Sequence, residues 1–256
     1  ALNEAGKLDE AIEAYKKALS INPDNAEAYN NIGSALKDQG KIDEAIEAYK
    51  KALSLKPDYK SARHMLSSLS GDTTETAPRE YVENLFEMHA KKFEATLVSE
   101  LEYRTPKLIS DMLKNLNRNM PLGSVLDLGC GTGLLGLELK NHSSKLEGID
   151  LSKKMLAIAK QKNIYDTLSQ SDIIDYLSSM PLDFDYYVAL DVFVYIGNLN
   201  EIFQLIKSRN NRSGMFAFST EHSEYGAYNL LKTGRYSHSK SYIESLCEKF
   251  DYKICH

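Results

Sequence analysis

A short apolar run that ends in an acid and passes straight into a glycine-rich turn constrains this 256-residue chain most. The stretch 125–133 reads VLDLGCGTG, and the leucine-rich pattern of a helix begins at Leu134. Glycines at alternate positions let the backbone approach a ligand closely, and a helix N-terminus offers unpaired N–H donors. The stretch therefore predicts a strand, a turn and a helix start that together cradle a nucleotide-like ligand.

The first part of the chain repeats itself. Residues 6–24 return nearly unchanged as residues 40–58, an offset of 34 residues, which is the period of tetratricopeptide (TPR) repeats. One whole repeat at 26–59 carries that family's packing positions, namely Tyr29, Ile32, Gly33, Leu36, Ala45, Tyr49, Ala52 and Pro57. The region resembles a TPR array, and we expect it to span 1–69.

Within this region the full repeat is preceded by a lone second helix and followed by a closing helix at 60–69. About three such repeats are normally needed for stability, so we expect the natural protein to extend further N-terminally. The repeats are either a spacer or a groove that binds a protein or peptide partner. Asn30, Ser34 and Lys37 lie on the helix face that lines such grooves.

The remainder of the chain has a different pattern. A polar, turn-rich linker is predicted at 70–78. Beyond it, apolar runs alternate with amphipathic stretches, which predicts a parallel, doubly wound α/β sheet of the Rossmann-like type. Strands are expected at 124–128, 146–150, 168–171, 186–191, 215–219 and 252–255. Helices are expected at 79–97, 105–117, 133–141, 152–161, 172–179, 199–208 and 239–249.

Composition narrows the function. The net charge of −5 does not favour binding to nucleic acid. The sequence contains no run of 18 apolar residues, so no membrane-spanning helix is predicted. Cys130, Cys247 and Cys255 lack metal-ligand spacing and cannot all pair, so no metal site is expected. A reducing, cytoplasmic location is the simplest reading.

Two nucleotide classes compete for the glycine turn. Residues 131–136 match G-x-G-x-x-G, and Asp150 follows at the spacing of a dinucleotide fingerprint, so a nicotinamide-dependent oxidoreductase is an alternative. The register favours another ligand, because the strand ends at Leu128 and Gly129 already opens the turn. Asp127 then faces the ligand, and its carboxylate would repel a pyrophosphate but attract a cationic amino group and sulfonium. That ligand is S-adenosylmethionine.

The stretch 125–133 resembles the first motif of class I S-adenosylmethionine-dependent methyltransferases. The resemblance implies that Asp150 holds both ribose hydroxyls, that Leu151 and Met155 flank the adenine, and that Asp172 and Ile173 contact the adenine edge. Residues 186–197 resemble the fourth strand and the loop beneath the methyl group. The implied cofactor-binding set is Asp127, Gly129, Cys130, Gly131, Gly133, Asp150, Leu151, Met155, Asp172, Ile173, Asp191 and Tyr103. Each of Asp150 and Asp172, considered alone, could instead cap the helix that follows it.

The resemblance extends beyond the shared core. Segments 79–93, 102–106 and 236–239 look like a bacterial group of predicted methyltransferases that carry N-terminal TPR repeats. The resemblance implies a methyltransferase domain over 79–256, with 79–120 as a helical lid. The aromatic residues of this lid either close over the cofactor or pack the helix against the domain. The lid candidates are Tyr81, Phe86, Phe93 and Tyr103. The fold normally ends with a seventh strand, which we expect to be missing because the chain stops just after the predicted sixth.

Methyl transfer from a sulfonium is an in-line displacement, so most of the catalysis lies in positioning. Ligands bind outside the carboxyl ends of such strands, which places Asp191, Tyr195 and the loop 220–238 around the acceptor. His238 is the candidate base, with His222 and His89 as alternatives, although His238 also suits a cap of the helix after it. A second hypothesis is a scaffold that binds the cofactor without turnover. The methyl acceptor is unidentified.

Overall fold

The computed structural model describes residues 2–95, 97, 102–118, 120–212 and 214–255. These fall into two compact units. The first joins residues 1–80 to the short segment 230–235, and the second comprises 81–229 and 236–256. The predicted boundaries at 69, 78 and 120 stay a prediction, since compactness alone places the division after Glu80.

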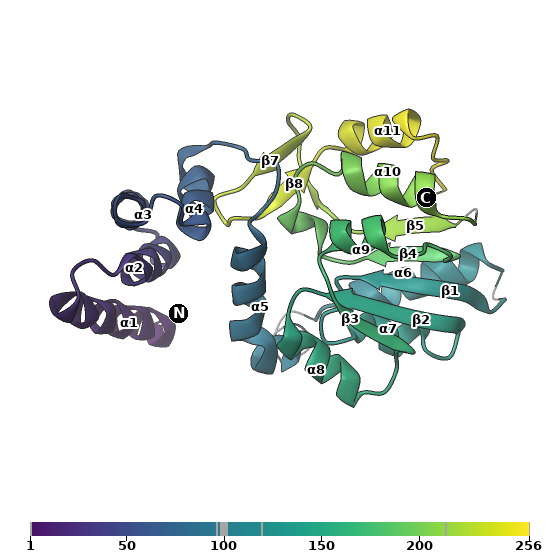
Figure 1. Ribbon diagram of the computed structural model, residues 1–256, viewed down its shortest axis with the longest axis horizontal. Helices are drawn as coiled ribbons and strands as arrows, with labels where there is room; N and C mark the ends of the chain where they lie inside the picture. The colour runs from purple at the N-terminus through teal and green to yellow at the C-terminus, as the bar shows by residue number, and fades with distance from the viewer. Residues whose placement is uncertain (1, 96, 98–101, 119, 213, 256) are drawn as a thin grey trace. The chain divides into compact units, whose positions relative to one another are not determined.

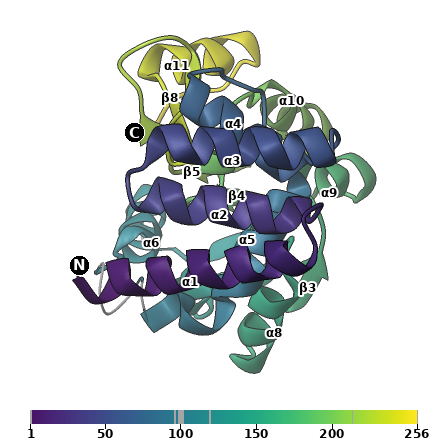
Figure 2. The ribbon, with the colours of Figure 1, turned by 90° about the vertical axis from the view of Figure 1, so that its left-hand side faces the viewer.

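Four helices build most of the first unit. They are α1 (Leu2–Ile21), α2 (Ala26–Asp38), α3 (Ile42–Leu55) and α4 (Lys60–Ser70). Each packs against the next along the chain, and α1, α2 and α3 lie side by side (Figure 2). Asn25 caps α2, its side chain accepting the N–H of Ala28 at 3.1 Å. Ala45, Tyr49 and Ala52 are fully buried, as expected of the small and aromatic packing positions of a repeat.

The segment 230–235 reaches the first unit from far along the chain. The N–H of Leu230 donates to Thr73 Oγ1 at 3.3 Å, and His64 Nε2 lies 3.0 Å from the carbonyl oxygen of Gly234. His64 is 3% exposed, and burial lowers its pKa, so this ring is a neutral donor to the Gly234 carbonyl. The sequence analysis did not anticipate this packing.

A five-stranded parallel sheet forms the centre of the second unit (Figure 1). Its strands are β1 (Leu122–Leu128), β2 (Ser143–Asp150), β3 (Thr167–Gln170), β4 (Tyr186–Ala189) and β5 (Met215–Phe218). Their order is β3-β2-β1-β4-β5, and every neighbouring pair is parallel. The order reverses beside β1, which makes the carboxyl end of β1 the topological switch point where ligands of such sheets bind.

Helices accompany the strands as the alternating pattern predicts. They are α5 (Arg79–Glu94), α6 (Thr105–Leu116), α7 (Leu134–Leu139), α8 (Lys153–Gln161), α9 (Ile173–Ser179), α10 (Asn200–Arg209) and α11 (Lys240–Lys249), with a short 3₁₀ turn η2 (Phe193–Tyr195). The predicted architecture of helical repeats followed by a doubly wound α/β domain is confirmed.

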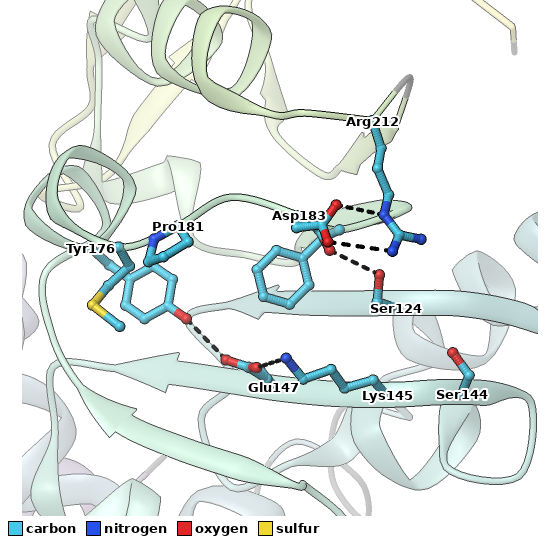
Figure 3. Close-up of a pocket in the computed structure, with 10 residues that line it drawn as sticks. Ser124, Ser144, Lys145, Glu147, Tyr176, Pro181, Asp183 and Arg212 are labelled. Atoms are coloured by element: carbon cyan, nitrogen blue, oxygen red, sulfur yellow. Dashed lines mark hydrogen bonds and ion pairs between the residues drawn. The ribbon is translucent and has the colours of Figure 1, made fainter.

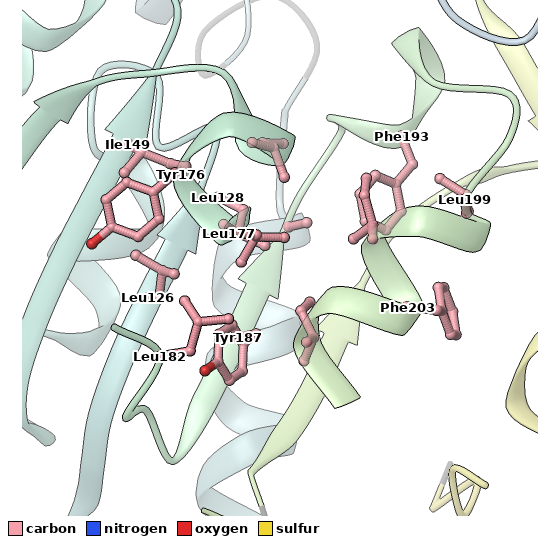
Figure 4. Packing of buried hydrophobic residues seen from close by; sticks show 14 of the residues in the cluster. Leu126, Leu128, Ile149, Tyr176, Leu177, Leu182, Tyr187, Phe193, Leu199 and Phe203 are labelled. Carbon is pink, nitrogen blue, oxygen red and sulfur yellow. The ribbon is translucent and has the colours of Figure 1, made fainter. Parts of the chain in front are cut away.

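Alternate residues of the strands pack into two hydrophobic clusters, one on each face of the sheet. Leu126, Leu128 and Tyr187 join the cluster that α9, α10 and α11 cover (Figure 4). Val125 and Val188 join the opposite cluster with Leu113 of α6 and residues of α7. Because successive side chains of a strand point to opposite faces, Asp127 shares the face of Val125 and lies under α7.

Two expectations for the end of the chain are corrected. The predicted strand at 252–255 is wrong, because these residues form no strand in the described structure; Tyr252 instead hydrogen-bonds to the carbonyl oxygen of Phe203 on α10 at 2.9 Å. The predicted loop 220–238 contains three short strands, β6 (Glu221–His222), β7 (Tyr228–Leu230) and β8 (Tyr236–His238), which form a separate sheet in the order β6-β8-β7.

Gly33 provides a test of the repeat packing. A β carbon at Gly33 would lie 2.9 Å from Cε1 of Tyr49, which is fully buried. A helical Gly→Ala change normally stabilises by about 0.5–1 kcal/mol, whereas overpacking costs about 1–3 kcal/mol. We expect Gly33→Ala to lower the free energy of unfolding by about 1 kcal/mol in urea titrations. Ser34→Ala is the control, and an unchanged or raised stability of Gly33→Ala would contradict this packing.

Candidate active site

The glycine turn lies at the carboxyl end of β1 and depends on left-handed backbone. Gly129, Gly131 and Gly133 have φ values of 76°, 54° and 89°. A β carbon on Gly129 would lie 2.3 Å from Val192 Cγ2. Among the described residues, one on Gly131 would meet only Phe93, at 3.9 Å. The amides of Gly129 and Cys130 donate to the carbonyl oxygen of Ile149 at 2.9 and 2.8 Å, which ties the turn to the end of β2.

Asp127 is the acid at the end of β1, and it is 2% exposed. Its Oδ2 accepts a hydrogen bond of 2.6 Å from the Tyr165 hydroxyl. Burial raises the pKa of Asp127 to about 7; the Tyr165 hydrogen bond opposes this rise and the nearby Asp150 charge adds to it. The carboxylate is thus costly to ionise without a cationic partner, as expected for an acid that binds a positively charged ligand.

Asp150, at the end of the neighbouring strand β2, fastens the turn. Its Oδ2 accepts the N–H of Gly131 at 2.8 Å, and its Oδ1 accepts the N–H of Ser152 at 2.8 Å. Burial raises its pKa, and these backbone hydrogen bonds oppose that rise. Ser152 in turn caps α8 by accepting the N–H of Met155. Asp150 therefore joins the glycine turn to the start of α8.

Thr132 supplies an observation that the sequence analysis missed. Its side chain is 1% exposed, and its Oγ1 has no hydrogen-bond partner among the described residues. A buried hydroxyl without a partner costs free energy, and it signals a missing ligand or water. Because Thr132 lies between Gly131 and Gly133, this orphaned hydroxyl is consistent with a polar ligand held by the turn.

The predicted adenine contacts occupy the ends of β2 and β3. Leu151 is half-buried and Met155 fully buried. Asp172 caps α9, its Oδ1 accepting the amides of Ile174 at 2.8 Å and Asp175 at 3.3 Å. Ile173 packs into the core beneath α9. The helix-capping role of Asp172 is thus present, and its adenine contact stays a prediction.

Cys130 is buried in the same turn. A β carbon on Gly148 would lie 2.9 Å from Cys130 Sγ, so the thiol fills the space beside that glycine. Burial, together with the charges of Asp127 and Asp150, raises the pKa of the thiol well above its usual range. The group therefore stays protonated, which excludes nucleophilic chemistry and leaves Cys130 a backbone and packing role in the turn.

A second group of candidates gathers at the carboxyl end of β4. Asp191 adopts a φ of 54°, which is unusual for a residue with a side chain. Its N–H donates to Ser219 Oγ at 2.8 Å, and Ser219 Oγ donates back to Asp191 Oδ1 at 3.2 Å. Tyr103 also hydrogen-bonds to the Asp191 carboxylate, and burial together with that contact raises the Tyr103 pKa far above its usual value. The structure brings Asp191 and Tyr103 together.

Aromatic side chains of α5 meet this group. The ring of Phe86 lies edge-on to Tyr195 of η2, with centroids 5.5 Å apart, and to Phe93, with centroids 5.9 Å apart. Phe93 is also the neighbour of the open face of Gly131. The two predicted lid residues Phe86 and Phe93 therefore lie between Tyr195 and the glycine turn.

Charged groups hold α5 against α8. Glu87 Oε1 accepts the Ser152 hydroxyl at 2.8 Å and the N–H of Lys154 at 2.9 Å, and its Oε2 lies 3.4 Å from Lys154 Nζ. These hydrogen bonds, with that of the Lys154 amide the largest, hold the pKa of Glu87 below its usual value. Glu94 forms a second ion pair with Lys162. Through Ser152, Glu87 is one hydrogen bond away from the Asp150 loop.

The three histidine candidates lie in different environments. His238 is 1% exposed; its Nε2 contacts the carbonyl oxygens of Ile196 and Gly197 at 2.9 and 3.0 Å, and its Nδ1 lies 2.5 Å from Thr220 Oγ1. Both ring nitrogens are engaged, and burial lowers the His238 pKa. This environment is typical of a structural histidine, and the role of His238 as a base stays a prediction. His222 is exposed and lies 3.2 Å from Glu224, and His89 is exposed.

A pocket of about 370 Å³ lies near the opposite, amino ends of β1 and β4 (Figure 3). Lys145 and Arg212 line it, but each is already paired: Lys145 with Glu147, and Arg212 with Asp183 and Asp185. The positive charges of the pocket are thus already balanced by ion pairs with neighbouring carboxylates. It lies away from the glycine turn and contains none of the predicted site residues.

The third glycine of the dinucleotide-like pattern has another explanation. A β carbon on Gly136 would lie 2.6 Å from Cζ of Tyr165, so this glycine makes room for the tyrosine that contacts Asp127. In a dinucleotide fingerprint the third glycine serves close packing of helix on strand. Gly136 therefore gives no support to the nicotinamide alternative.

The fold has its topological switch point at β1, and β1 and β2 each end at or next to an aspartate. Solved structures with a similar fold are known. Among solved structures it is similar to magnesium protoporphyrin IX methyltransferase from Synechocystis PCC 6803 with bound SAH, with a TM-score of 0.56, 17% identity, and coverage of 70% of this chain and 90% of that one. It is also similar to the DhpI-SAH complex, with a TM-score of 0.52, 18% identity, and coverage of 67% and 86%. At these identities the likeness concerns the fold.

Sequence comparison identifies the family. A model of the methyltransferase domain matches residues 120–255, more than half of the chain, and the chain belongs to this family. Tetratricopeptide repeat models match residues 1–40 and 26–59. The predicted combination of TPR repeats and a methyltransferase domain is confirmed.

Curated relatives match over part of their length. Ubiquinone biosynthesis O-methyltransferase of Azoarcus sp. (strain BH72) is 26% identical over 132 residues, which are 45% of this chain and 56% of that protein. The protein of the same name from Dechloromonas aromatica (strain RCB) is 31% identical over 114 residues, 36% of this chain and 48% of that protein. The chain thus spans about half the length of the curated relatives it matches. Among the described residues, none of the helices is long and apolar enough to cross a membrane.

The raised pKa of Asp127 predicts a pH-dependent stability. A carboxyl whose folded pKa exceeds its unfolded value makes the protein lose stability as pH rises from about 4 to about 7. Asp127→Asn removes this loss, so we expect the variant's advantage over the wild type to be larger at pH 8 than at pH 5, by roughly 2 kcal/mol. Urea unfolding without ligand at both pH values measures it. An advantage that does not change with pH would show that Asp127 ionises normally.

Proposed function

We propose that this chain is an S-adenosylmethionine-dependent methyltransferase. The observation that carries the proposal is the pair of acids at the ends of neighbouring strands, Asp127 buried and Asp150 half-buried, beside a glycine turn with an orphaned Thr132 hydroxyl. Family membership and the fold support the same activity.

The residues present fit this cofactor. Asp127 would bind its amino group, Asp150 its ribose hydroxyls, and Leu151, Met155, Asp172 and Ile173 its adenine. Gly129, Gly131 and Gly133 keep the turn open for the amino-acid portion. When bound there, the cofactor supplies a methyl group on a sulfonium, which needs no further activation.

The chain's own residues then position the acceptor. Asp191, Tyr195 and Tyr103 would line its side of the site, and the carboxylate of Asp191 is the proton acceptor best placed for an acceptor that carries a proton. Two hydroxyls, from Tyr103 and Ser219, fix the orientation of that carboxylate. The aromatic rings of Phe86 and Phe93 would exclude water from the reacting atoms, which makes α5 part of the lid proposed for 79–120.

The TPR region is proposed to bind a protein partner. Asn30, Ser34 and Lys37 of α2 are only half-buried and lie on the face that such arrays use. This region would bring the methyltransferase domain to its substrate or complex, in the cytoplasm. Radiolabelled methyl transfer to cell extract separated into protein, lipid and small molecules would identify the class of acceptor. A wild type that binds the cofactor but labels nothing would favour a scaffold without turnover.

Titration calorimetry with S-adenosylhomocysteine tests the cofactor site. We expect Asp150→Ala to weaken binding at least tenfold, about 1.4 kcal/mol, because the ribose loses a bidentate acceptor and the turn loses the Gly131 hydrogen bond. Asp183→Ala, an acid on the pocket at the other end of the sheet, is the control and should bind as the wild type does. A wild type that fails to bind would refute the proposed function.

The lid has a separate test at Glu87. Glu87→Ala removes the acceptor of the Ser152 hydroxyl and of the Lys154 amide, so α5 should open more readily. We expect S-adenosylhomocysteine to dissociate about tenfold faster in stopped-flow measurements, equivalent to ~1.4 kcal/mol. Glu83→Ala, one turn earlier on the same helix, serves as the control. Equal dissociation rates for the two variants would assign α5 to packing alone.

A further inference from the structure

We propose that Tyr165 is a positioning residue for the cofactor's amino-acid portion, its hydroxyl keeping the Asp127 carboxylate aimed at the cationic amino group. This inference rests on the proposed function and assigns a residue that lies outside the motifs of the sequence analysis. Tyr165 falls between α8 and β3, and 38 residues separate it from Asp127.

The ring of Tyr165 lies against three glycines, in space that side chains at those positions would fill. A β carbon would lie 3.1 Å from the ring at Gly133, 2.6 Å at Gly136 and 3.0 Å at Gly148. These glycines come from the turn, α7 and β2 respectively. Tyr165 is the nearest neighbour at Gly136, whereas Ile164 lies closest to Gly133 and Cys130 closest to Gly148. A side chain at Gly136 would therefore displace the ring most directly.

The hydroxyl of Tyr165 forms a hydrogen bond to Asp127. It donates to Asp127 Oδ2 at 2.6 Å, a short charge-assisted hydrogen bond. Within the described part of the chain, the other titratable groups that face Asp127 are Asp150, Tyr103 and Cys130, and none of them is a cation. Tyr165 is therefore the side-chain donor that offsets the burial of the carboxylate before a cationic ligand arrives.

Without the hydroxyl, two effects follow. Asp127 loses a hydrogen bond that lowers its pKa, so a smaller fraction is ionised at pH 7. The carboxylate also gains freedom to rotate away from the ligand. Both effects weaken attraction for an ammonium group and leave the contacts to the ribose and adenine unchanged. The expected consequence is a loss confined to ligands that carry the amino acid.

Two ligands separate this effect from general damage. S-adenosylhomocysteine has the amino-acid portion, whereas 5′-methylthioadenosine has the same nucleoside and thioether without it. We expect Tyr165→Phe to weaken S-adenosylhomocysteine about tenfold at pH 7 in calorimetry and to leave 5′-methylthioadenosine within twofold of the wild type. The loss should shrink as pH rises to 8.5, because the remaining Asp127 then ionises.

Matched controls exist in the same domain. Tyr176 donates to Glu147 Oε2 at 3.0 Å, a comparable tyrosine–carboxylate pair on the pocket away from the site. Tyr176→Phe should change neither affinity. In a background of Asp127→Asn, Tyr165→Phe should have no further effect on S-adenosylhomocysteine, since the carboxylate it positions is gone.

The outcomes are distinguishable. If Tyr165→Phe weakens both ligands equally, or neither, the positioning role is overturned while the proposed function stands. If the wild type binds neither ligand, the proposed function itself fails. Should Tyr165→Phe unfold at the assay temperature, Gly136→Ala decides, because its β carbon would lie 2.6 Å from Tyr165 Cζ and displace the ring. It must weaken S-adenosylhomocysteine more than 5′-methylthioadenosine; equal affinity changes for the two ligands would overturn the inference.

Discussion

Two buried carboxylates at neighbouring strand ends are the constraint on which the site depends. Asp127 ends β1 and Asp150 ends β2, and the burial that surrounds them disfavours their charged forms. Each is held by specific donors, the Tyr165 hydroxyl for one and the backbone amides of Gly131 and Ser152 for the other. A site that concentrates negative charge in this way is complementary to a ligand with a cation at one end and hydroxyls at the other.

The same hydrogen bonds link the site to its surroundings. Asp150 holds the turn through Gly131 and the start of α8 through Ser152, and Ser152 donates to Glu87 of α5. Asp150, the glycine turn and the helix proposed as the lid are therefore connected within three hydrogen bonds. A change in the position of Asp150 on ligand binding would reach α5 by this route.

Sequence alone could predict the parts of the site that are local in the chain. The strand, the terminal acid and the glycines of residues 125–133 are contiguous, and alternation of strands and helices determines the parallel order that places Asp150 beside Asp127. Tyr165 could not be found in this way. Its partner lies 38 positions away, and in the sequence Gly136 matches the third glycine of a dinucleotide pattern and gives no sign of a tyrosine ring beside it.

Tertiary packing determines features that local patterns cannot predict. His238 is chemically suited to be a base, and that role stays a prediction; β8 places its ring in the interior with both nitrogens hydrogen-bonded. The sequence predicts a strand at 252–255, yet these residues form none, and Tyr252 is anchored on α10. The TPR helices were predictable because each contacts its neighbours along the chain, whereas the packing of 230–235 with α4 joins residues 170 positions apart.

Asp191 shows how the proposed acceptor side of the site differs from the proposed cofactor side. A left-handed backbone at a residue with a side chain costs on the order of 1 kcal/mol, and such strain persists only where the surroundings impose it. Here Ser219 contacts both the amide and the carboxylate of Asp191, and Tyr103 contacts the carboxylate as well. Since methyl transfer requires chiefly that the acceptor be held in line, a strained and doubly held carboxylate at the end of β4 is suited to orienting that acceptor and receiving its proton.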